Sequence, residues 1–251
     1  MSNLDLLIDL HRKEQRQGPG GVEETRLAIG LSGLRDKRDL KIADIGCGTG
    51  ASTLVLAAEL DAEITAVDFL PDLLEDLRIN TSRAGVSDRV TTLAASMKFL
   101  PFQDRAFDAI WSEGAIYNMG FVAGIRAWHR LLKPGGLLAV SELIWLTGER
   151  PTELEQYWHH EYPEVATASV KIAQLEESGY APVGYFTLPN ACWLKNYYRP
   201  LRQAFPDFLE RNNHSQPARA LVEAEEREIE IYERYSDFFS YGFFVATKMA
   251  D

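Results

Sequence analysis

Short apolar runs alternate with longer mixed segments through the first two thirds of the chain. From Lys41 to about Val140, each apolar run has the length of a strand, and the segments between them have the content of amphipathic helices. The strands expected here span 42–45, 63–68, 89–94, 107–112 and 137–143, with helices expected at 52–59 and 71–84. Strands that alternate with helices form parallel sheets covered on both faces. The pattern therefore predicts an α/β fold with a mostly parallel sheet.

The two ends of the chain follow a different pattern. An amphipathic helix is expected at 4–11, a break at 15–21 and a second helix at 22–34. Beyond residue 147 the pattern predicts a helix at 170–178, a sixth strand at 181–188, an acidic helix at 217–239 and a last strand at 242–248. The acidic helix is interpreted as a solvated face packed on the sheet or on a second subunit rather than as a catalytic part.

The most informative stretch is Ile42–Gly50, where a strand opens into Gly46, Gly48 and Gly50 before a helix. Glycine permits positive φ angles and close approach of a ligand, and the free N–H groups of a helix start can face that ligand. The spacing Gly46-x-Gly48-x-x-Ala51 also satisfies the dinucleotide fingerprint. An NAD-dependent oxidoreductase is therefore one reading of this turn.

Two carboxylates favour a different cofactor. Asp44 precedes the turn, where a carboxylate suits a cationic amino-acid end better than a pyrophosphate, and Asp68 ends the second strand, where it can accept both ribose hydroxyls. With these residues the stretch resembles the cofactor-binding motif of class I S-adenosylmethionine (SAM)-dependent methyltransferases. Leu100–Ser112 and Leu131–Gly136 resemble two further motifs of that family, and Leu131–Gly136 is expected to stop a helix before the fifth strand.

The resemblance is to the ubiquinone/menaquinone-biosynthesis-type small-molecule methyltransferases. It implies a Rossmann-like, doubly wound, seven-stranded sheet with SAM as cofactor. It also implies a division into an N-terminal helical cap (1–40), a core (41–189), a helical insertion (190–241) and the last core strand (242–251). The insertion is interpreted as an acceptor lid or a dimer arm, which leaves a homodimer open. Residues 17–21 are either a flexible linker or part of a cap that closes over the cofactor, because such enzymes often place N-terminal segments there.

The same resemblance implies a set of cofactor contacts. The amino-acid end of SAM would lie against the glycine turn with Asp44 beneath it, Asp68 would hold the ribose, and Phe69 and Met97 would flank the adenine. Ser96 stands where the family often has an acid that contacts the adenine amino group, and its hydroxyl keeps one hydrogen bond. The predicted cofactor-binding residues are Gln17, Asp44, Gly46, Cys47, Gly48, Gly50, Asp68, Phe69, Ser96, Met97 and Glu113.

The catalytic residues are less constrained by the sequence. Methyl transfer is an in-line displacement with a neutral leaving group, so a base is needed only when the acceptor keeps its proton. Glu113, Tyr117 and His160 are the candidates, since they belong to segments expected over the carboxyl ends of the fourth and fifth strands. No metal site is expected. Glu113 could serve the cofactor or the acceptor, and His160 could instead be a surface residue.

Composition narrows the class of acceptor. The formal net charge is −11 and the sequence pI is about 5.0, and no run of Lys or Arg offers a patch for nucleic acid or an anionic membrane. The two cysteines form no disulfide framework, and no apolar run reaches transmembrane length, so a cytoplasmic location is expected. These features predict a small-molecule acceptor in an aromatic pocket. A non-catalytic protein that binds SAM or S-adenosylhomocysteine remains an alternative.

Overall fold

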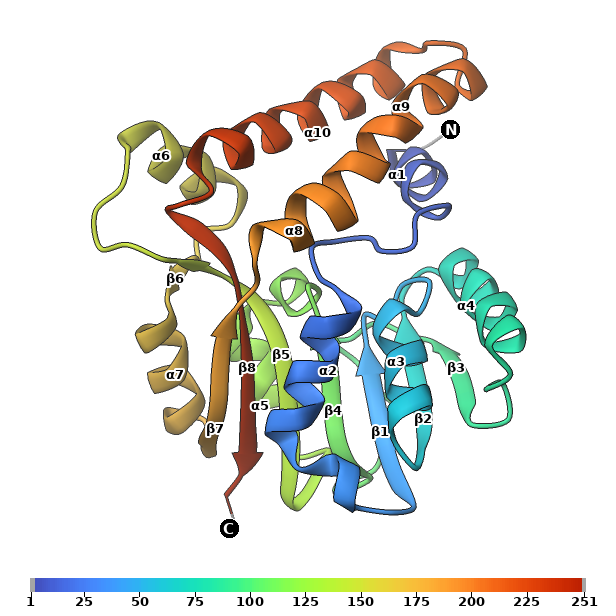
Figure 1. The fold of residues 1–251 in the computed structure, drawn as a ribbon, viewed down its shortest axis with the longest axis vertical. Helices are drawn as coiled ribbons and strands as arrows, with labels where there is room; N and C mark the ends of the chain where they lie inside the picture. The colour runs from blue at the N-terminus through green and yellow to red at the C-terminus, as the bar shows by residue number, and fades with distance from the viewer. Residues whose placement is uncertain (1–2, 250–251) are drawn as a thin grey trace.

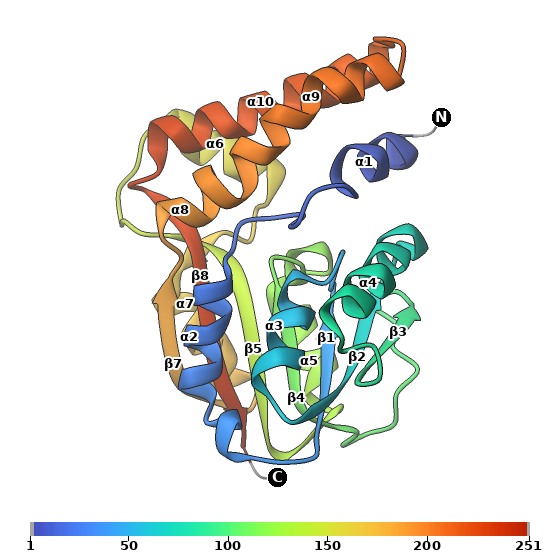
Figure 2. The same ribbon diagram turned by 45° about the vertical axis from the view of Figure 1, so that its right-hand side comes forward.

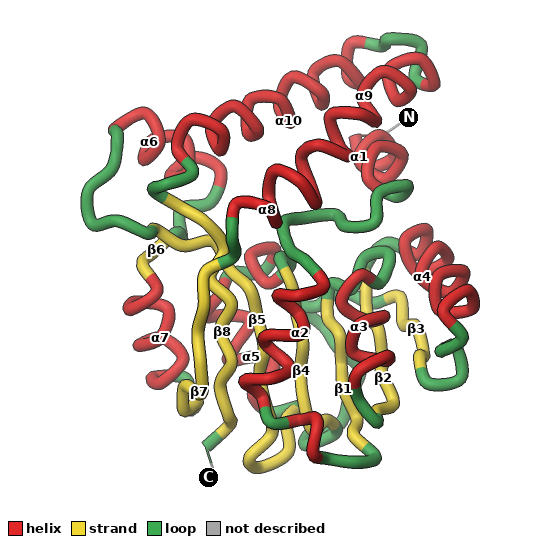
Figure 3. Tube along the Cα trace, viewed as in Figure 1, coloured by secondary structure: helices red, strands yellow, loops and turns green. Residues whose placement is uncertain are grey.

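A mixed sheet forms the centre of the molecule, as a computed structural model that describes residues 3–249 shows (Figures 1 and 3). Its strands are β1 Leu40–Ile45, β2 Ala62–Asp68, β3 Val90–Ala94, β4 Phe107–Glu113, β5 Leu132–Trp145, β6 Ala166–Thr167, β7 Tyr180–Thr187 and β8 Phe239–Lys248. Seven of them follow the order β3-β2-β1-β4-β5-β8-β7, and the two-residue β6 pairs with β5 beside that path. Only the pairings of β8 are antiparallel within the described range. The predicted Rossmann-like fold is confirmed.

Helices cover both faces of the sheet and its upper edge (Figures 1 and 2). They are α1 Asn3–His11, α2 Val22–Ser32, α3 Ala51–Glu59, α4 Pro71–Ala84, α5 Phe121–His129, α6 Thr152–Glu161, α7 Ala168–Glu177, α8 Asn190–Trp193, α9 Arg199–Arg211 and α10 Gln216–Tyr235. Helices α2, α3 and α4 lie on one face, and α5 and α7 on the other. No helix within residues 3–249 is long and apolar enough to cross a membrane.

Two hydrophobic cores form because strand side chains alternate between faces. In β4, Ala109 and Trp111 join the core under α2 and α3, whereas Ile110 joins the core under α5 and α7. In β5, Leu138 and Val140 lie on the same side as Ile110. Both faces of these central strands are therefore apolar, which explains the continuous hydrophobic runs that marked them in the sequence.

The segment Lys133–Gly136 does not stop a helix as expected. Helix α5 already ends at His129, and β5 includes this segment. The register between β4 and β5 shifts at Asp108, and Gly135 takes a φ of +70° in the irregular stretch. Lys133 Nζ lies 2.8 Å from both carboxylate oxygens of Asp108, so an ion pair fastens the stretch to the neighbouring strand. Proline and glycine here accommodate a bulge rather than end a helix.

The chain between β7 and β8 builds a helical layer over the carboxyl ends of the parallel strands (Figure 1). It runs through α8, a π-helical turn at Leu194–Tyr198, α9 and α10. Trp193 holds the layer together, since its ring stacks on Tyr232 at 4.4 Å and lies edge-on to Phe239 at 5.9 Å. Helix α1 packs against α9 and α10. Elements from both ends of the chain therefore cover the same edge of the sheet.

Candidate active site

A cavity of about 630 Å³ lies at the carboxyl ends of the parallel strands. This volume is in the range of pockets that bind small molecules and cofactors. Its lower wall comes from the glycine turn after β1 and the segments that follow β2, β3 and β4, and its upper wall comes from α1, the segment 12–21, the π-helical turn and α10. The location agrees with the rule that open α/β sheets bind ligands beyond the carboxyl ends of their strands.

The glycine turn has the geometry that a ligand cradle requires. Gly46, Gly48 and Gly50 have φ angles of 76°, 55° and 94°, a region that other residues rarely adopt. A Cβ at Gly46 would lie 2.3 Å from the Cβ of Ala115, so a side chain has no room there. The N–H groups of Gly46 and Cys47 donate to Val67 O at 2.8 and 3.1 Å, which fixes the turn against β2.

Asp68 lies at the end of β2 and faces this turn. Its Oδ2 accepts from the N–H of Gly48 and its Oδ1 accepts from the N–H of Leu70, both at 2.9 Å. Burial raises the pKa of Asp68, and these backbone donors oppose that rise. Each carboxylate oxygen keeps a second lone pair, so the group can still accept hydrogen bonds from a ligand in the cavity.

Asp44 lies beneath the turn rather than in the cavity wall. Its carboxylate is fully buried, and Oδ2 accepts from the hydroxyls of Ser52 and Thr53 in the first turn of α3. Oδ1 has no hydrogen-bond partner within the described residues, and burial raises the pKa of the group to about 7. The expected position beneath the turn is therefore found, and a direct contact with the cofactor stays a prediction.

The side chains expected at the adenine gather at the other end of the lower wall. Phe69 lines the cavity with 65% of its surface exposed, and Ser96 and Met97 line it as well. The carbonyl of Met97 accepts from Trp128 Nε1 at 3.2 Å, which holds this loop on the core. An exposed aromatic ring beside a cavity offers the stacking surface that an adenine needs.

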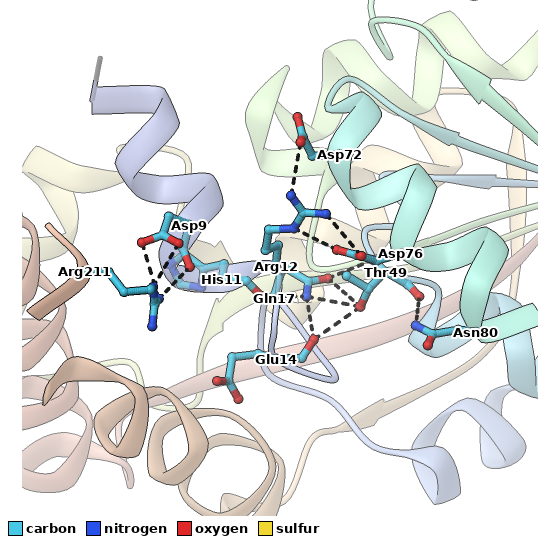
Figure 4. Close-up of polar contacts among 10 residues, drawn as sticks. All are labelled: Asp9, His11, Arg12, Glu14, Gln17, Thr49, Asp72, Asp76, Asn80 and Arg211. Carbon is cyan, nitrogen blue, oxygen red and sulfur yellow. Dashed lines mark hydrogen bonds and ion pairs between the residues drawn. The ribbon is translucent and has the colours of Figure 1, made fainter. Parts of the chain in front are cut away.

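The segment between α1 and α2, which we call the strap (residues 12–21), packs against the glycine turn (Figure 4). Gln17 Oε1 accepts from the N–H of Thr49 at 3.0 Å, and Gln17 Nε2 donates to the carbonyl of Glu14 at 3.0 Å. Arg16 forms an ion pair with Glu113. The strap is thus a docked cap over the turn and not a free linker.

Both carboxylate oxygens of Glu113 already have hydrogen-bond donors. Oε1 accepts from Thr25 Oγ1 at 2.7 Å and from Trp111 Nε1 at 2.9 Å, while Oε2 pairs with Arg16. Glu113 lines the cavity, and its visible role is to anchor the strap and α2 to β4.

Tyr117 lines the cavity from the turn that follows β4. Its ring lies edge-on to Tyr162 at a centroid distance of 6.0 Å, and the hydroxyl of Tyr162 donates to Glu142 Oε2 at 3.2 Å. Burial raises the pKa of Tyr117, so its hydroxyl stays protonated at neutral pH and can donate a hydrogen bond.

The structure does not bring His160 to the cavity. Helix α6 buries Leu154 and Trp158, which are four residues apart on one face, and this arrangement leaves His159 and His160 exposed on the other. Trp158 packs on Phe239 in the core rather than in the cavity wall. The segment 156–163 therefore reaches the site only indirectly, through the contact of Tyr162 with Tyr117.

Several cavity residues were not predicted from the sequence. They are His11, Arg16, Tyr197, Glu225 and Glu228. One signal was available in α10, where Ala218, Val222, Glu225, Ile229 and Tyr232 recur with the spacing of a single helical face. Glu225 is the acidic residue in this otherwise apolar stripe, which indicates that it lies on the packed face of the helix and not on the solvent face. Helix α10 was expected to be a packed, solvated face rather than a catalytic part. Its residues Glu225 and Glu228 line the cavity, which agrees with the alternative of an acceptor lid.

Comparison with known proteins shows a similarity to methyltransferases in the first half of the chain. Residues 42–136 match the family described as methyltransferase domain, and this range holds the glycine turn, Asp68 and Glu113. Together with the fold, the match supports the resemblance to class I SAM-dependent methyltransferases. The predicted resemblance is confirmed.

Two individual relatives carry the names of methyltransferases. The chain is 28% identical over 187 residues to 27-O-demethylrifamycin SV methyltransferase of Amycolatopsis mediterranei, with 68% of this chain and 66% of the relative covered. It is 39% identical over 131 residues to demethylmenaquinone methyltransferase of Corynebacterium urealyticum, with 48% and 53% covered. The chain thus spans about half to two thirds of these relatives.

A solved structure shares nearly the whole fold. The SAM-dependent methyltransferase from Geobacter sulfurreducens in complex with S-adenosylhomocysteine aligns with a TM-score of 0.84 and 17% identity, covering 97% of this chain and 98% of that one. The likeness therefore extends beyond the matched domain to the helical layer between β7 and β8.

Proposed function

We propose that the protein transfers a methyl group from SAM to a small-molecule acceptor by in-line displacement. The observation that carries the proposal is one continuous cavity with two chemically different ends. One end holds the glycine turn, Asp68 and Phe69, and the other holds Tyr117 and residues of the helical layer. A single cavity of this kind can hold a cofactor and an acceptor against each other.

The residues present fit SAM. The amino-acid end would lie against the glycine turn, where a Cβ would clash, with the unpaired Oδ1 of Asp44 beneath it. Asp68 would accept from the ribose hydroxyls, and Phe69, Ser96 and Met97 would surround the adenine. Bound SAM supplies an electrophilic methyl group and a leaving group that departs neutral. The task left to the chain is to position the acceptor and exclude water.

The helical layer and the strap perform this second task in the proposal. The strap covers the glycine turn through Gln17 and Arg16, and Tyr117 and Tyr197 supply an aromatic wall on the acceptor side. We therefore assign α1, the strap and residues 190–241 to acceptor enclosure, and place α2, which packs on the sheet, with the core. A cytoplasmic location follows from the two free cysteines and the acidic charge, and the homodimer remains a prediction for sedimentation analysis.

Calorimetric titration with S-adenosylhomocysteine, run beside NADH, tests the proposal. We expect micromolar binding of S-adenosylhomocysteine and none of NADH. Binding of NADH alone would refute the cofactor assignment in favour of an oxidoreductase. If S-adenosylhomocysteine binds, a screen with methyl-tritiated SAM should find a methylated acceptor, and a chain that binds but never transfers would be the non-catalytic binder instead.

A further inference from the structure

A histidine outside the methyltransferase domain lies in the cavity with one nitrogen unpaired. His11, the last residue of α1, lines the cavity and is 8% exposed. Its Nε2 lies 3.2 Å from Oε1 of Glu225 in α10, and its Nδ1 is buried without a hydrogen-bond partner within residues 3–249. Glu225 also lines the cavity, and the pair joins residues 214 positions apart in the chain.

The carboxylate determines which nitrogen carries the proton. An ionised carboxylate only accepts hydrogen bonds, so Nε2 must donate and the neutral ring leaves Nδ1 as a bare acceptor. A buried acceptor without a partner is costly unless a ligand supplies the missing donor. An acceptor molecule with an O–H or N–H group at the reacting atom would supply that donor.

The surroundings hold the ring in place. Tyr197 of the π-helical turn lies parallel to it at a centroid distance of 6.4 Å, and α1 is anchored on one side by Arg12 with Asp76 and on the other by Asp9 with Arg211 (Figure 4). The ionisable groups that face His11 are Glu225 and Glu228 of α10, Tyr197 and, from the strap, Glu14.

On the basis of the proposed function, we infer that His11 is the general base for a proton-bearing acceptor, a hydroxyl or amine compound, and that Glu225 positions it. The acceptor oxygen or nitrogen forms the new bond to the methyl carbon. The carbon–sulfur bond breaks with its electron pair on sulfur, and the acceptor proton passes to Nδ1 of His11. The imidazolium next to Glu225 then returns the proton to solvent, which leaves the methylated product and S-adenosylhomocysteine.

The first test needs no acceptor. In protein labelled with ¹⁵N-histidine, with His11→Gln used to assign the signals, we expect His11 at pH 8 to show a protonated Nε2 and a bare Nδ1. Glu225→Ala should abolish this tautomer preference. A protonated Nδ1 at pH 8 would overturn the inference, whatever the outcome of the cofactor titration. His160→Gln, an exposed histidine on α6, is the matched control.

The second test measures transfer from methyl-tritiated SAM to a fixed panel: phenol, an aliphatic alcohol and a primary amine as proton-bearing acceptors, and trimethylamine and dimethyl sulfide as proton-free ones. We expect methylation only in the first group, with His11→Gln lowering kcat by roughly 10²–10⁴-fold and removing the acidic limb of the pH profile, where protonation of the base slows the reaction. Affinity for S-adenosylhomocysteine should not change. Transfer to the proton-free compounds, or an unchanged kcat and pH profile in His11→Gln, would refute the base while leaving the methyltransferase assignment intact.

Discussion

The two ends of the cavity are built in opposite ways. The cofactor end consists of the glycine turn, Asp68 and the loop around Ser96, each of which directly follows a strand of the core. The acceptor end joins His11 of α1 to Tyr197 and Glu225 of the helical layer, more than half the chain away. Local backbone geometry fixes the first end, whereas long-range packing assembles the second. Changes at the two ends should therefore have separable effects.

The largest effect is expected from Gly46→Ala at the cofactor end. The new Cβ would lie 2.3 Å from Ala115 Cβ at a φ of 76°, so the free energy of unfolding should fall by about 2–5 kcal/mol from strain and overpacking together. Denaturant unfolding measures it. Gly30→Ala in α2, where nothing lies within 4 Å, should match or exceed the wild type. Equal stability of Gly46→Ala and wild type would show that the turn is looser than its geometry indicates.

Asp68→Ala should weaken cofactor binding without touching the acceptor end. Loss of charge-assisted hydrogen bonds to the ribose costs about 1–3 kcal/mol in the binding of S-adenosylhomocysteine. Calorimetry on the folded variant measures the difference. Asp61→Asn, an exposed aspartate next to the start of β2, serves as the control. Unchanged affinity in Asp68→Ala would remove Asp68 from the site.

The pH dependence of stability in Glu228→Gln tests whether this carboxyl at the acceptor end is buried. Burial raises the pKa of Glu228 to about 7, so the folded state holds a proton that the unfolded state has lost above about pH 4.5. This group therefore lowers stability as pH rises from about 4.5 to 7. The wild type should lose on the order of 1–3 kcal/mol between pH 5 and 8 relative to Glu228→Gln. Parallel pH profiles would contradict the burial of this carboxyl, and exposed Glu223→Gln on the same helix should show no such difference.

The smallest effect is expected where the two ends meet. Arg12 lies 3.0 Å from Asp76 and 3.2 Å from Asp72, both on α4, and so ties α1 to the core. Partly exposed ion pairs contribute about 0–1 kcal/mol each. Arg12→Gln should therefore change affinity for S-adenosylhomocysteine by less than about 30-fold, yet increase hydrogen–deuterium exchange across residues 3–20. Arg38→Gln removes a surface ion pair with Asp61 and serves as the control. Increased exchange of residues 3–20 in Arg38→Gln but not in Arg12→Gln would refute the link.

The sequence predicted those parts of the fold and the site whose conformation depends on local residues. Glycines with positive φ, the apolar strands and Asp68 each follow from local chemistry, and the core order of strand and helix was predicted correctly. Lys133–Gly136 was misread because proline and glycine suit a bulge as well as a helix end. His11 and Glu225 were missed because only tertiary packing brings them together, although the carboxylate in the apolar stripe of α10 was a visible anomaly. His160 was wrongly expected at the site because the sequence does not show which face of α6 packs on the protein and which is exposed.

The docked strap affects how fast a bound ligand can leave the cavity. Gln17 lies so close to Gly48 that a Cβ there would meet its Oε1, and Arg16 closes the same region through Glu113. A ligand held under these side chains leaves only when they lift together. We therefore expect the residence time of S-adenosylhomocysteine to be set by how often α1 and the strap open, so that product departure rather than methyl transfer limits the turnover number.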